Sequence, residues 1–139
     1  MKKALLILCL LAMFVLSACT RNHGDIGIWF GTWHVESVTA DGTRVNDLTG
    51  DYFFQFQSTV FKVSQVYGHE DLVESFGTWE EQGSTMTIDF PDPGVFYIQM
   101  PGLESHNAFT MSDVSSKKAT FTKVDATGVN YTYQLKKSY

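Results

Sequence analysis

Cysteine is almost absent from this sequence. Cys9 and Cys19 lie near the amino terminus, and the rest of the chain contains no other. A disulfide framework is therefore excluded for the main part of the chain, and so are zinc sites built on pairs of cysteines. The stability of this region must come from packing.

Positive charge is also scarce. Lys and Arg number 10 against 15 Asp and Glu, so the net charge is −5. Affinity for nucleic acid depends on Lys and Arg side chains that neutralise phosphates. An acidic chain of this kind is a poor binder of polyanions, and we exclude nucleic acid as a partner.

The sequence has one long apolar run, and it is too short to span a membrane. Residues 4–16 carry no charge and follow Met1-Lys2-Lys3, whereas a transmembrane helix needs about 20 apolar residues. A positive start followed by a short apolar stretch is typical of a secretory signal. Its removal would take away Lys2 and Lys3 and change the net charge from −5 to −7.

The end of the run, Leu16-Ser17-Ala18-Cys19, resembles the bacterial lipobox. This resemblance implies a diacylglyceryl group on the Cys19 sulfur, cleavage before Cys19 and acylation of the new amino terminus, which together anchor a protein firmly to a membrane. Thr20 stands where an Asp would favour retention in the inner membrane, so we expect attachment to the outer membrane. The sequence does not indicate whether the protein lies on the periplasmic face or on the cell surface. The expected organisation is a signal peptide over residues 1–18, a lipidated cysteine and tether over 19–28, and one domain over 29–139.

A helical period is lacking after the tether, and apolar residues alternate instead with period two. Met86, Ile88 and Phe90 share one face of a strand, while the polar residues between them share the other. Such alternation predicts half-buried strands. About nine segments show it, over residues 32–39, 51–57, 60–67, 72–81, 85–90, 95–100, 107–112, 119–124 and 129–136.

Turn residues separate these segments at fairly even intervals. Pairs such as Asp41-Gly42, Pro101-Gly102 and Thr127-Gly128 punctuate the chain, as expected for an antiparallel meander. Short, numerous strands must avoid open edges, and closure into a barrel removes them. We therefore predict an all-β, antiparallel up-and-down barrel of about eight or nine strands, with a two-sheet sandwich as the alternative.

Two similar motifs carry a family resemblance. Gly31-Thr32-Trp33 opens the first predicted strand, and Gly77-Thr78-Trp79 recurs in the middle of the chain. A first-strand Gly-x-Trp resembles the signature of lipocalins and the wider calycin group. The layout from residue 29 onward is similar to that of the small lipocalin-like lipoproteins of the Bacteroidetes.

The lipocalin resemblance implies a role for Trp33 as the plug of the closed end of the barrel, with Gly31 allowing close approach of the backbone. Lipocalins place an Arg of the last strand over this Trp and then add a carboxy-terminal helix. This chain ends shortly after Lys136 and Lys137. Either lysine could supply the cation over Trp33, although neither has the planar fork of Arg.

Aromatic residues are plentiful, with 11 Phe, 6 Tyr and 3 Trp. Most must fill the interior of the barrel, and some could line a cavity for an apolar or ring-bearing ligand. Phe53 lies on the strand face opposite to Phe54, so one of these two faces meets another element or stays exposed. The candidate ligand-binding residues are Tyr52, Phe54, Phe56, Phe61, Tyr67 and Tyr97.

Patterns for metal binding or catalysis are missing. The histidines His23, His34, His69 and His106 are scattered without the spacing of a tetrahedral zinc site. Ser105-His106 lacks a nucleophile elbow, and no sequence motif around it assigns an acid that would complete a catalytic triad. Neighbouring Glu80 and Glu81 should point to opposite faces of a strand, and Asp92 lies between two prolines, away from Asp89. We expect no catalytic activity, no metal and no cofactor.

These observations predict an outer-membrane lipoprotein whose lipocalin-like domain binds or carries a small hydrophobic ligand. The alternative is a protein-binding module of the cell envelope, such as a protease inhibitor or an assembly accessory, with a partner that the sequence does not identify. Residues 20–27 and 91–94 would then be the contact elements. An avidin-like barrel would also have Gly-Thr-Trp strands, but we find no polar ligand cage of the kind it requires.

Overall fold

The computed structural model describes residues 3–4, 7, 27–68, 71–91 and 100–138. Among the described residues from 31 onward, all regular structure is β, as alternating polar and apolar residues predict. The strands are β1 (Gly31–Ala40), β2 (Thr43–Arg44), β3 (Asp51–Gln57), β4 (Val60–Tyr67), β5 (Asp71–Gln82), β6 (Thr85–Asp89), β7 (His106–Ser112), β8 (Lys118–Val124) and β9 (Asn130–Lys137).

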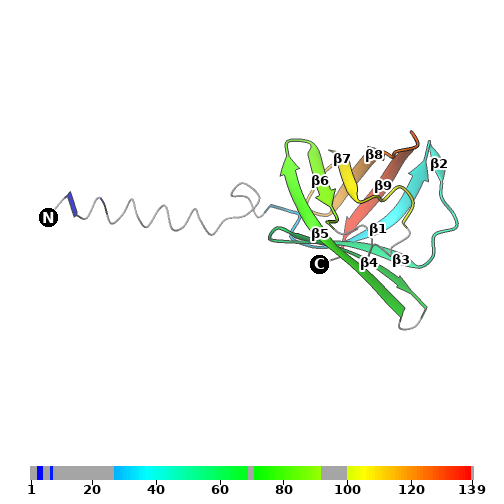
Figure 1. Cartoon of the computed structure of the whole chain (residues 1–139), viewed down its shortest axis with the longest axis horizontal. Helices are drawn as coiled ribbons and strands as arrows, with labels where there is room; N and C mark the ends of the chain where they lie inside the picture. Colours follow the sequence, from blue (N-terminus) through cyan, green and yellow to red (C-terminus); the bar gives the residue numbers. More distant parts are fainter. Residues whose placement is uncertain (1–2, 5–6, 8–26, 69–70, 92–99, 139) are drawn as a thin grey trace.

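The strands form one closed antiparallel sheet (Figure 1). From β3 to β9 each strand pairs with the next one in the chain, and β1 pairs with both β3 and β9 to close the barrel. The short β2 adds only to the end of β1. The predicted up-and-down barrel is therefore confirmed, as an eight-stranded barrel with one extra strand, and the sandwich alternative is wrong.

Strand β1 joins the two sides of the barrel by changing partners along its length. Its first half pairs with β3, from Gly31 opposite Phe56, whereas beyond His34 it has left β3 and pairs with β9, with β2 added at its last two residues. The register with β9 shifts between Val35 and Ser37. An extra residue of this kind bends the strand, and it lets Val35 and Val38 both face the interior.

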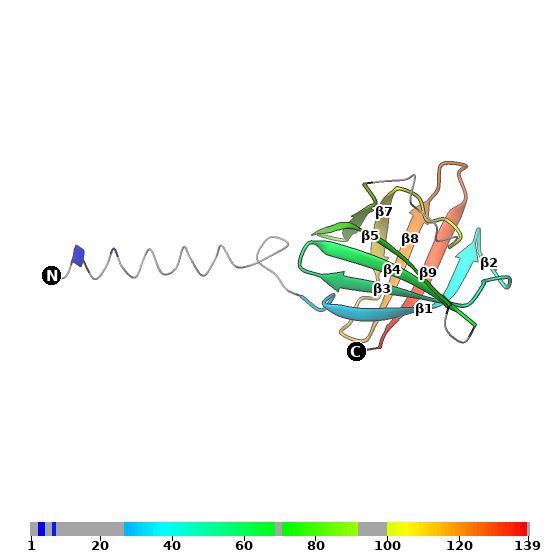
Figure 2. The same cartoon turned by 60° about the horizontal axis from the view of Figure 1, so that its bottom comes forward.

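The two ends of the barrel differ. The chain enters at the end where β1 begins and β9 stops, and this closed end also holds the turns that connect β3 to β4 and β5 to β6 (Figure 2). Backbone bonding ties the termini of the domain together there, since the Ser138 amide donates to the Thr32 carbonyl at 2.8 Å. The segments 41–50, 101–105 and 125–129 lie at the opposite, open end.

Aromatic rings fill the interior towards the closed end. The ring centroids of Phe54 and Phe61 lie 5.2 Å apart, and those of Phe109 and Phe121 are also 5.2 Å apart. All four side chains are completely buried. Such ring pairs add about 0.5–1.5 kcal/mol each beyond the area they bury, so the deep part of the barrel is a solid core.

The strand boundaries agree with the sequence to within a residue or two, with two differences. Residues 95–99 of the expected strand 95–100 lie outside the described residues, and Met100 is buried but not part of a strand. The short β2 was not predicted, because two exposed residues carry no alternation to detect. None of the described residues belongs to a helix long and apolar enough to cross a membrane.

Candidate ligand pocket at the open end of the barrel

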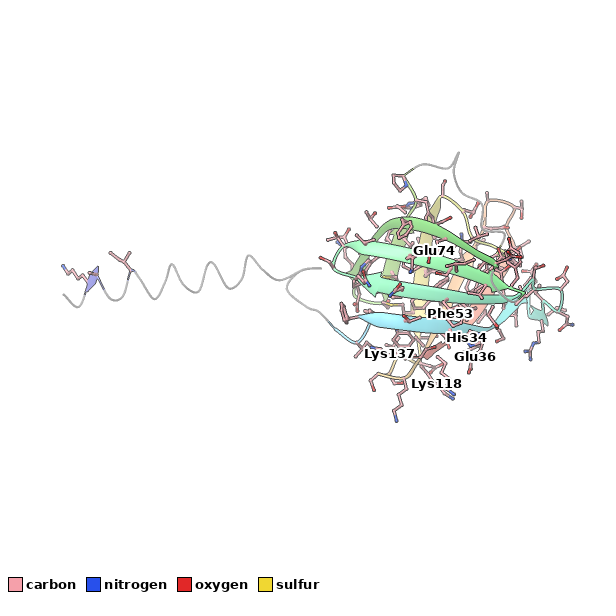
Figure 3. All side chains as sticks on the ribbon, turned by 90° about the horizontal axis from the view of Figure 1, so that it is seen from below. His34, Glu36, Phe53, Glu74, Lys118 and Lys137 are labelled. Atoms are coloured by element: carbon pink, nitrogen blue, oxygen red, sulfur yellow. The ribbon has the colours of Figure 1, made fainter. Side chains whose placement is uncertain are left out.

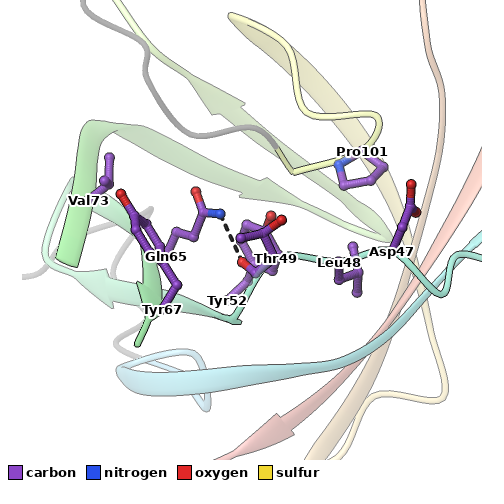
Figure 4. A pocket seen from close by; sticks show the side chains of 8 residues that line it. All are labelled: Asp47, Leu48, Thr49, Tyr52, Gln65, Tyr67, Val73 and Pro101. Carbon is purple, nitrogen blue, oxygen red and sulfur yellow. Dashed lines mark hydrogen bonds between the residues drawn. The ribbon is translucent and has the colours of Figure 1, made fainter. Parts of the chain in front are cut away.

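A pocket of about 490 Å³ opens at the end of the barrel away from the chain entry. Figure 4 shows the side chains that line it. Its volume falls in the range of about 300–1,000 Å³ that is usual for small-molecule sites. The wall combines aromatic, aliphatic and polar side chains. The lining residues are Asp47, Leu48, Thr49, Tyr52, Gln65, Tyr67, Val73 and Pro101.

Three adjacent strands supply the rigid side of this pocket. Tyr52 of β3 lies opposite Gln65 of β4, and Gln65 lies opposite Val73 of β5. Residues directly opposite each other in antiparallel strands project to the same face of the sheet, so these side chains converge inside the barrel. Tyr67, two residues after Gln65, continues the same face towards the rim.

Gln65 is oriented by a hydrogen bond within the pocket wall. Its side-chain Nε2 donates to the Thr49 carbonyl at 2.9 Å, and the residue is 6% exposed. A carbonyl oxygen can only accept, so the atom that faces Thr49 must be the amide nitrogen. Gln65 Oε1 has no hydrogen-bond partner among the described residues, which leaves it as an acceptor for a ligand.

Tyr52 lies at the inner part of the wall and is almost completely buried. Burial raises the pKa of its hydroxyl above the ordinary value. The side chain is therefore neutral at physiological pH and presents both a ring and a hydroxyl group.

A polar network supports the other side of the open end. The buried Lys123 ammonium donates to Glu104 Oε1 at 2.9 Å and to Asn107 Oδ1 at 2.8 Å. Asn107 Nδ2 in turn donates to the Glu104 carbonyl at 2.7 Å. The Tyr133 hydroxyl donates to the Pro101 carbonyl at 2.6 Å. These bonds hold residues 101–107 in place, and with them the Pro101 wall of the pocket.

The candidate ligand residues divide into three groups. Tyr52 and Tyr67 line the pocket. Phe54, Phe56 and Phe61 are completely buried in the core beneath it and do not belong to its lining. The sequence could not separate these groups, because all five alternate correctly for the inner face and only their height in the barrel differs. Tyr97 lies outside the described residues.

The closed end is built around Trp33, which is completely buried. Its Nε1 donates to the Trp29 carbonyl at 3.0 Å, and the two indole rings lie 5.2 Å apart. Trp29 is also buried, and its ring packs against that of Trp33. The sequence analysis did not assign Trp29 to the plug, although its place four residues before Trp33 could have indicated that role. Gly31 has a φ of 121°, which favours glycine.

Lys137 supplies the cation over Trp33. Its Nζ lies 5.4 Å from the centroid of the Trp33 ring and donates a hydrogen bond to the Ile28 carbonyl. Lys136 is exposed, because neighbouring residues of a strand point to opposite faces. The structure thus distinguishes the two lysines that the sequence left equivalent.

The second Gly-Thr-Trp motif lies in β5 and serves packing. Trp79 is buried, and its ring meets that of Phe56 edge-on at 5.1 Å. A Cβ atom on Gly77 would overlap the Asp89 carbonyl oxygen of β6. The glycine therefore allows β5 and β6 to approach closely.

Histidines on the outer surface form separate pairs with carboxylates. His34 lies 3.2 Å from Asp51 and against the ring of Phe53 on the outside of the barrel (Figure 3). His106 contacts Asp89, its cross-strand neighbour. No sequence motif paired His106 with an acid, whereas strand pairing places Asp89 beside it.

Neither histidine pair forms a recognisable metal or catalytic site. Among the described residues no group of three His, Cys, Asp or Glu side chains could hold a metal ion, and no hydroxyl group is bonded to His106. Glu80 is exposed and Glu81 half-buried, on opposite faces of β5. His23, His69 and Asp92 lie outside the described residues.

Comparisons with known proteins find similarity at the level of structure. No protein-family model matches the sequence, and no curated protein is significantly similar to it. A lipocalin-like protein from Bacteroides uniformis has 20% identity and a TM-score of 0.61, covering 80% of this chain and 99% of its own. An uncharacterized protein from Bacteroides eggerthii has 15% identity and a TM-score of 0.57, covering 78% and 98%.

A redesigned β-barrel shares the architecture as well. It has 17% identity and a TM-score of 0.51, covering 81% of this chain and 93% of its own. Identities this low are informative about fold alone. Together with the closed eight-stranded sheet and the plug at Trp33, these comparisons confirm that the domain has the lipocalin-like fold predicted from its Gly-x-Trp motifs.

Proposed function

We propose that this protein is a membrane-anchored binding protein without catalytic activity, which takes a small ring-bearing molecule into the open end of its barrel. The pocket of about 490 Å³ carries this proposal. The deep interior is occupied by aromatic side chains, so the ligand is one that fits the mouth, between Tyr52 and Tyr67, and does not thread through the barrel.

The composition of the wall refines the expected ligand. Leu48, Val73 and Pro101 offer apolar contact, whereas Asp47, Thr49 and Gln65 offer polar contact. A purely aliphatic ligand would leave buried polar groups such as Gln65 Oε1 without a partner, which costs free energy. An amphipathic ligand with at least one polar group suits this wall better than the purely hydrophobic one expected from the sequence.

Filling the pocket tests the proposal. Val73 points into the barrel, and its neighbour Leu72 points outward and is 53% exposed. Val73→Trp should abolish binding because the indole would occupy the pocket, whereas Leu72→Trp should leave binding unchanged. Small molecules that copurify with the full chain from its native envelope would be extracted and compared by mass spectrometry. Equal ligand content in the two variants would contradict the proposal.

The anchoring part of the proposal rests on the lipobox ending at Cys19. Trp29 follows soon after Cys19 in the chain and lies at the closed end, so a lipid on Cys19 would leave the pocket at the end far from its attachment. Cys19→Ser should release the protein from the membrane fraction. Mass spectrometry of the envelope protein should show an acylated Cys19 at a new amino terminus, and an unmodified Cys19 would contradict anchoring.

A protein-binding role is the second candidate, and one surface favours it. The outer face of β4 and β5 exposes Val66, Leu72 and Phe76, the last of them 59% exposed. Exposed apolar side chains on one face of a sheet can mark protein contacts. The Lys62–Glu74 ion pair lies between Phe76 and the other two side chains. Phe76→Asp should abolish recovery of any specific partner from detergent-solubilised envelope, whereas Val124→Asp, at a similarly exposed residue of β8, should not. Recovery unaffected by Phe76→Asp would contradict this candidate.

A further inference from the structure

We infer that the pocket selects a cationic, ring-bearing ligand, such as an aromatic amine; this inference rests on the proposed ligand-binding function. Among the described lining residues, Asp47 is the only charged side chain. No cationic side chain lines the pocket to receive an anionic group. A negative group on the ligand would therefore meet repulsion from Asp47, and an ammonium group would meet attraction.

The hydrogen-bonding groups of the pocket agree with its charge. Gln65 uses its amide nitrogen on the Thr49 carbonyl, so the atom it has left for a ligand, Oε1, is an acceptor. The carboxylate of Asp47 is also an acceptor. A ligand whose polar group donates hydrogen bonds satisfies both residues, and an ammonium group carries three donors.

The rings of the pocket suit the same ligand. Tyr52 and Tyr67 both line it, and the faces of such rings attract cations at up to about 6 Å. They also offer flat apolar surface to a second ring, and contacts between rings are favourable. An amine attached to an aromatic ring can use both properties at once.

Charges around the open end reinforce the selection. Asp41 follows β1, Asp71 begins β5 and Asp125 follows β8, so all three carboxylates surround this end. The described cations at this end are Arg44 and Lys123, and Lys123 is neutralised by its contact with Glu104. A cleft surrounded by one sign of charge concentrates ligands of the opposite sign.

Three probes of similar shape test the inference. Tryptamine, tryptophol and indole-3-acetate carry the same indole ring with a cationic, a neutral and an anionic end. In isothermal titration calorimetry with the full chain in mild detergent, we expect tryptamine to bind at least about tenfold more tightly than indole-3-acetate, with tryptophol between them. The preference for tryptamine should weaken as the salt concentration rises, because salt screens charge.

Two variants identify the source of the selectivity. Asp47→Asn should bring the affinity for tryptamine down to that for tryptophol. Asp113→Asn makes the same change of charge at the closed end and should leave all three affinities unchanged; Asp113 has a φ of 50°, a conformation that Asn tolerates well.

The possible outcomes distinguish this inference from the proposed ligand-binding function on which it rests. Equal affinities for the three probes, or tightest binding of indole-3-acetate, would overturn charge selection and leave ligand binding intact. If none of the three probes binds while Val73→Trp still removes a copurified molecule, the inference fails and the proposed function stands. Failure of both experiments would remove the proposed function itself.

Discussion

Single residues at the closed end show how this chain completes a plug with lysine in place of the Arg that lipocalins use. Lys137 combines a cation–π contact with Trp33 and a hydrogen bond to the Ile28 carbonyl. Its aliphatic stem can pack on the barrel while its ammonium group serves both partners. Neighbouring Lys136 has no such contacts, although the two residues look alike in the sequence.

We therefore expect Lys137→Ala to lower the free energy of unfolding by about 1–2 kcal/mol, because it removes both contacts. Lys136→Ala serves as the matched control and should change it by less than about 0.5 kcal/mol. Lys137→Arg should retain the stability of the natural protein. Urea denaturation checks all three variants, and equal losses for the two alanine variants would contradict this account.

Gly77 provides a second test at the scale of single residues, because the requirement for glycine at this position is steric. A side chain there would overlap the backbone of Asp89, which cannot move without disturbing the pairing of β5 and β6. Gly77→Ala should lower the free energy of unfolding by about 1–3 kcal/mol, the usual cost of overpacking. Thr78→Ala, at an exposed neighbour, should have little effect in the same denaturation experiment.

At the scale of elements, the segment before β7 is held to the barrel by a buried charge. The Lys123 side chain is 2% exposed, and Glu104 neutralises it while also accepting a bond from the Ala126 amide at 3.2 Å. The network connects the 101–105 segment to the turn between β8 and β9. One ion pair therefore holds together two segments that are far apart in the sequence.

Removing Glu104 and removing Lys123 should lower the free energy of unfolding by unequal amounts. Glu104→Ala leaves the Lys123 charge buried without its partner and should cost about 3 kcal/mol. Lys123→Met removes the charge and keeps an apolar stem, so it should cost less. The double variant should be more stable than the sum of the single losses predicts. Chemical denaturation measures all three, and a larger loss for Lys123→Met would contradict the prediction.

At the scale of the whole molecule, burial of tyrosines couples stability to alkaline pH. Burial raises the pKa of Tyr133 far above its ordinary value and also raises those of Tyr52 and Tyr131. The unfolded chain releases these protons near pH 10, whereas the folded chain retains them. The stabilisation is thus complete below about pH 10 and is lost as the pH rises above it.

We expect unfolding at alkaline pH to coincide with tyrosine ionisation, followed by ultraviolet absorbance of tyrosinate alongside circular dichroism. Tyr133→Phe should cost about 1 kcal/mol at neutral pH, because it removes the bond to the Pro101 carbonyl. Its stability should then fall less steeply with rising pH than that of the natural protein. An unchanged slope would contradict the assignment to Tyr133.

Much of the fold could be predicted because period-two alternation is a local property. The inner face of β6, with Met86 and Ile88 buried, follows directly from the sequence. Site prediction was less complete, because height along the barrel axis is not local. Tyr52 and Phe54 differ by two residues on one face, yet one lines the pocket and the other lies in the core.

The sequence by itself determined the β class, the inner and outer faces of the strands and the Trp33 motif, because each depends on residues close together in the chain. Tertiary structure decided the rest. Closure of β1 onto β9 brought Lys137 rather than Lys136 to Trp33, and the pairing of β6 with β7 placed Asp89 beside His106. These choices depend on the register between paired strands, and a shift of one residue would exchange the inner and outer faces.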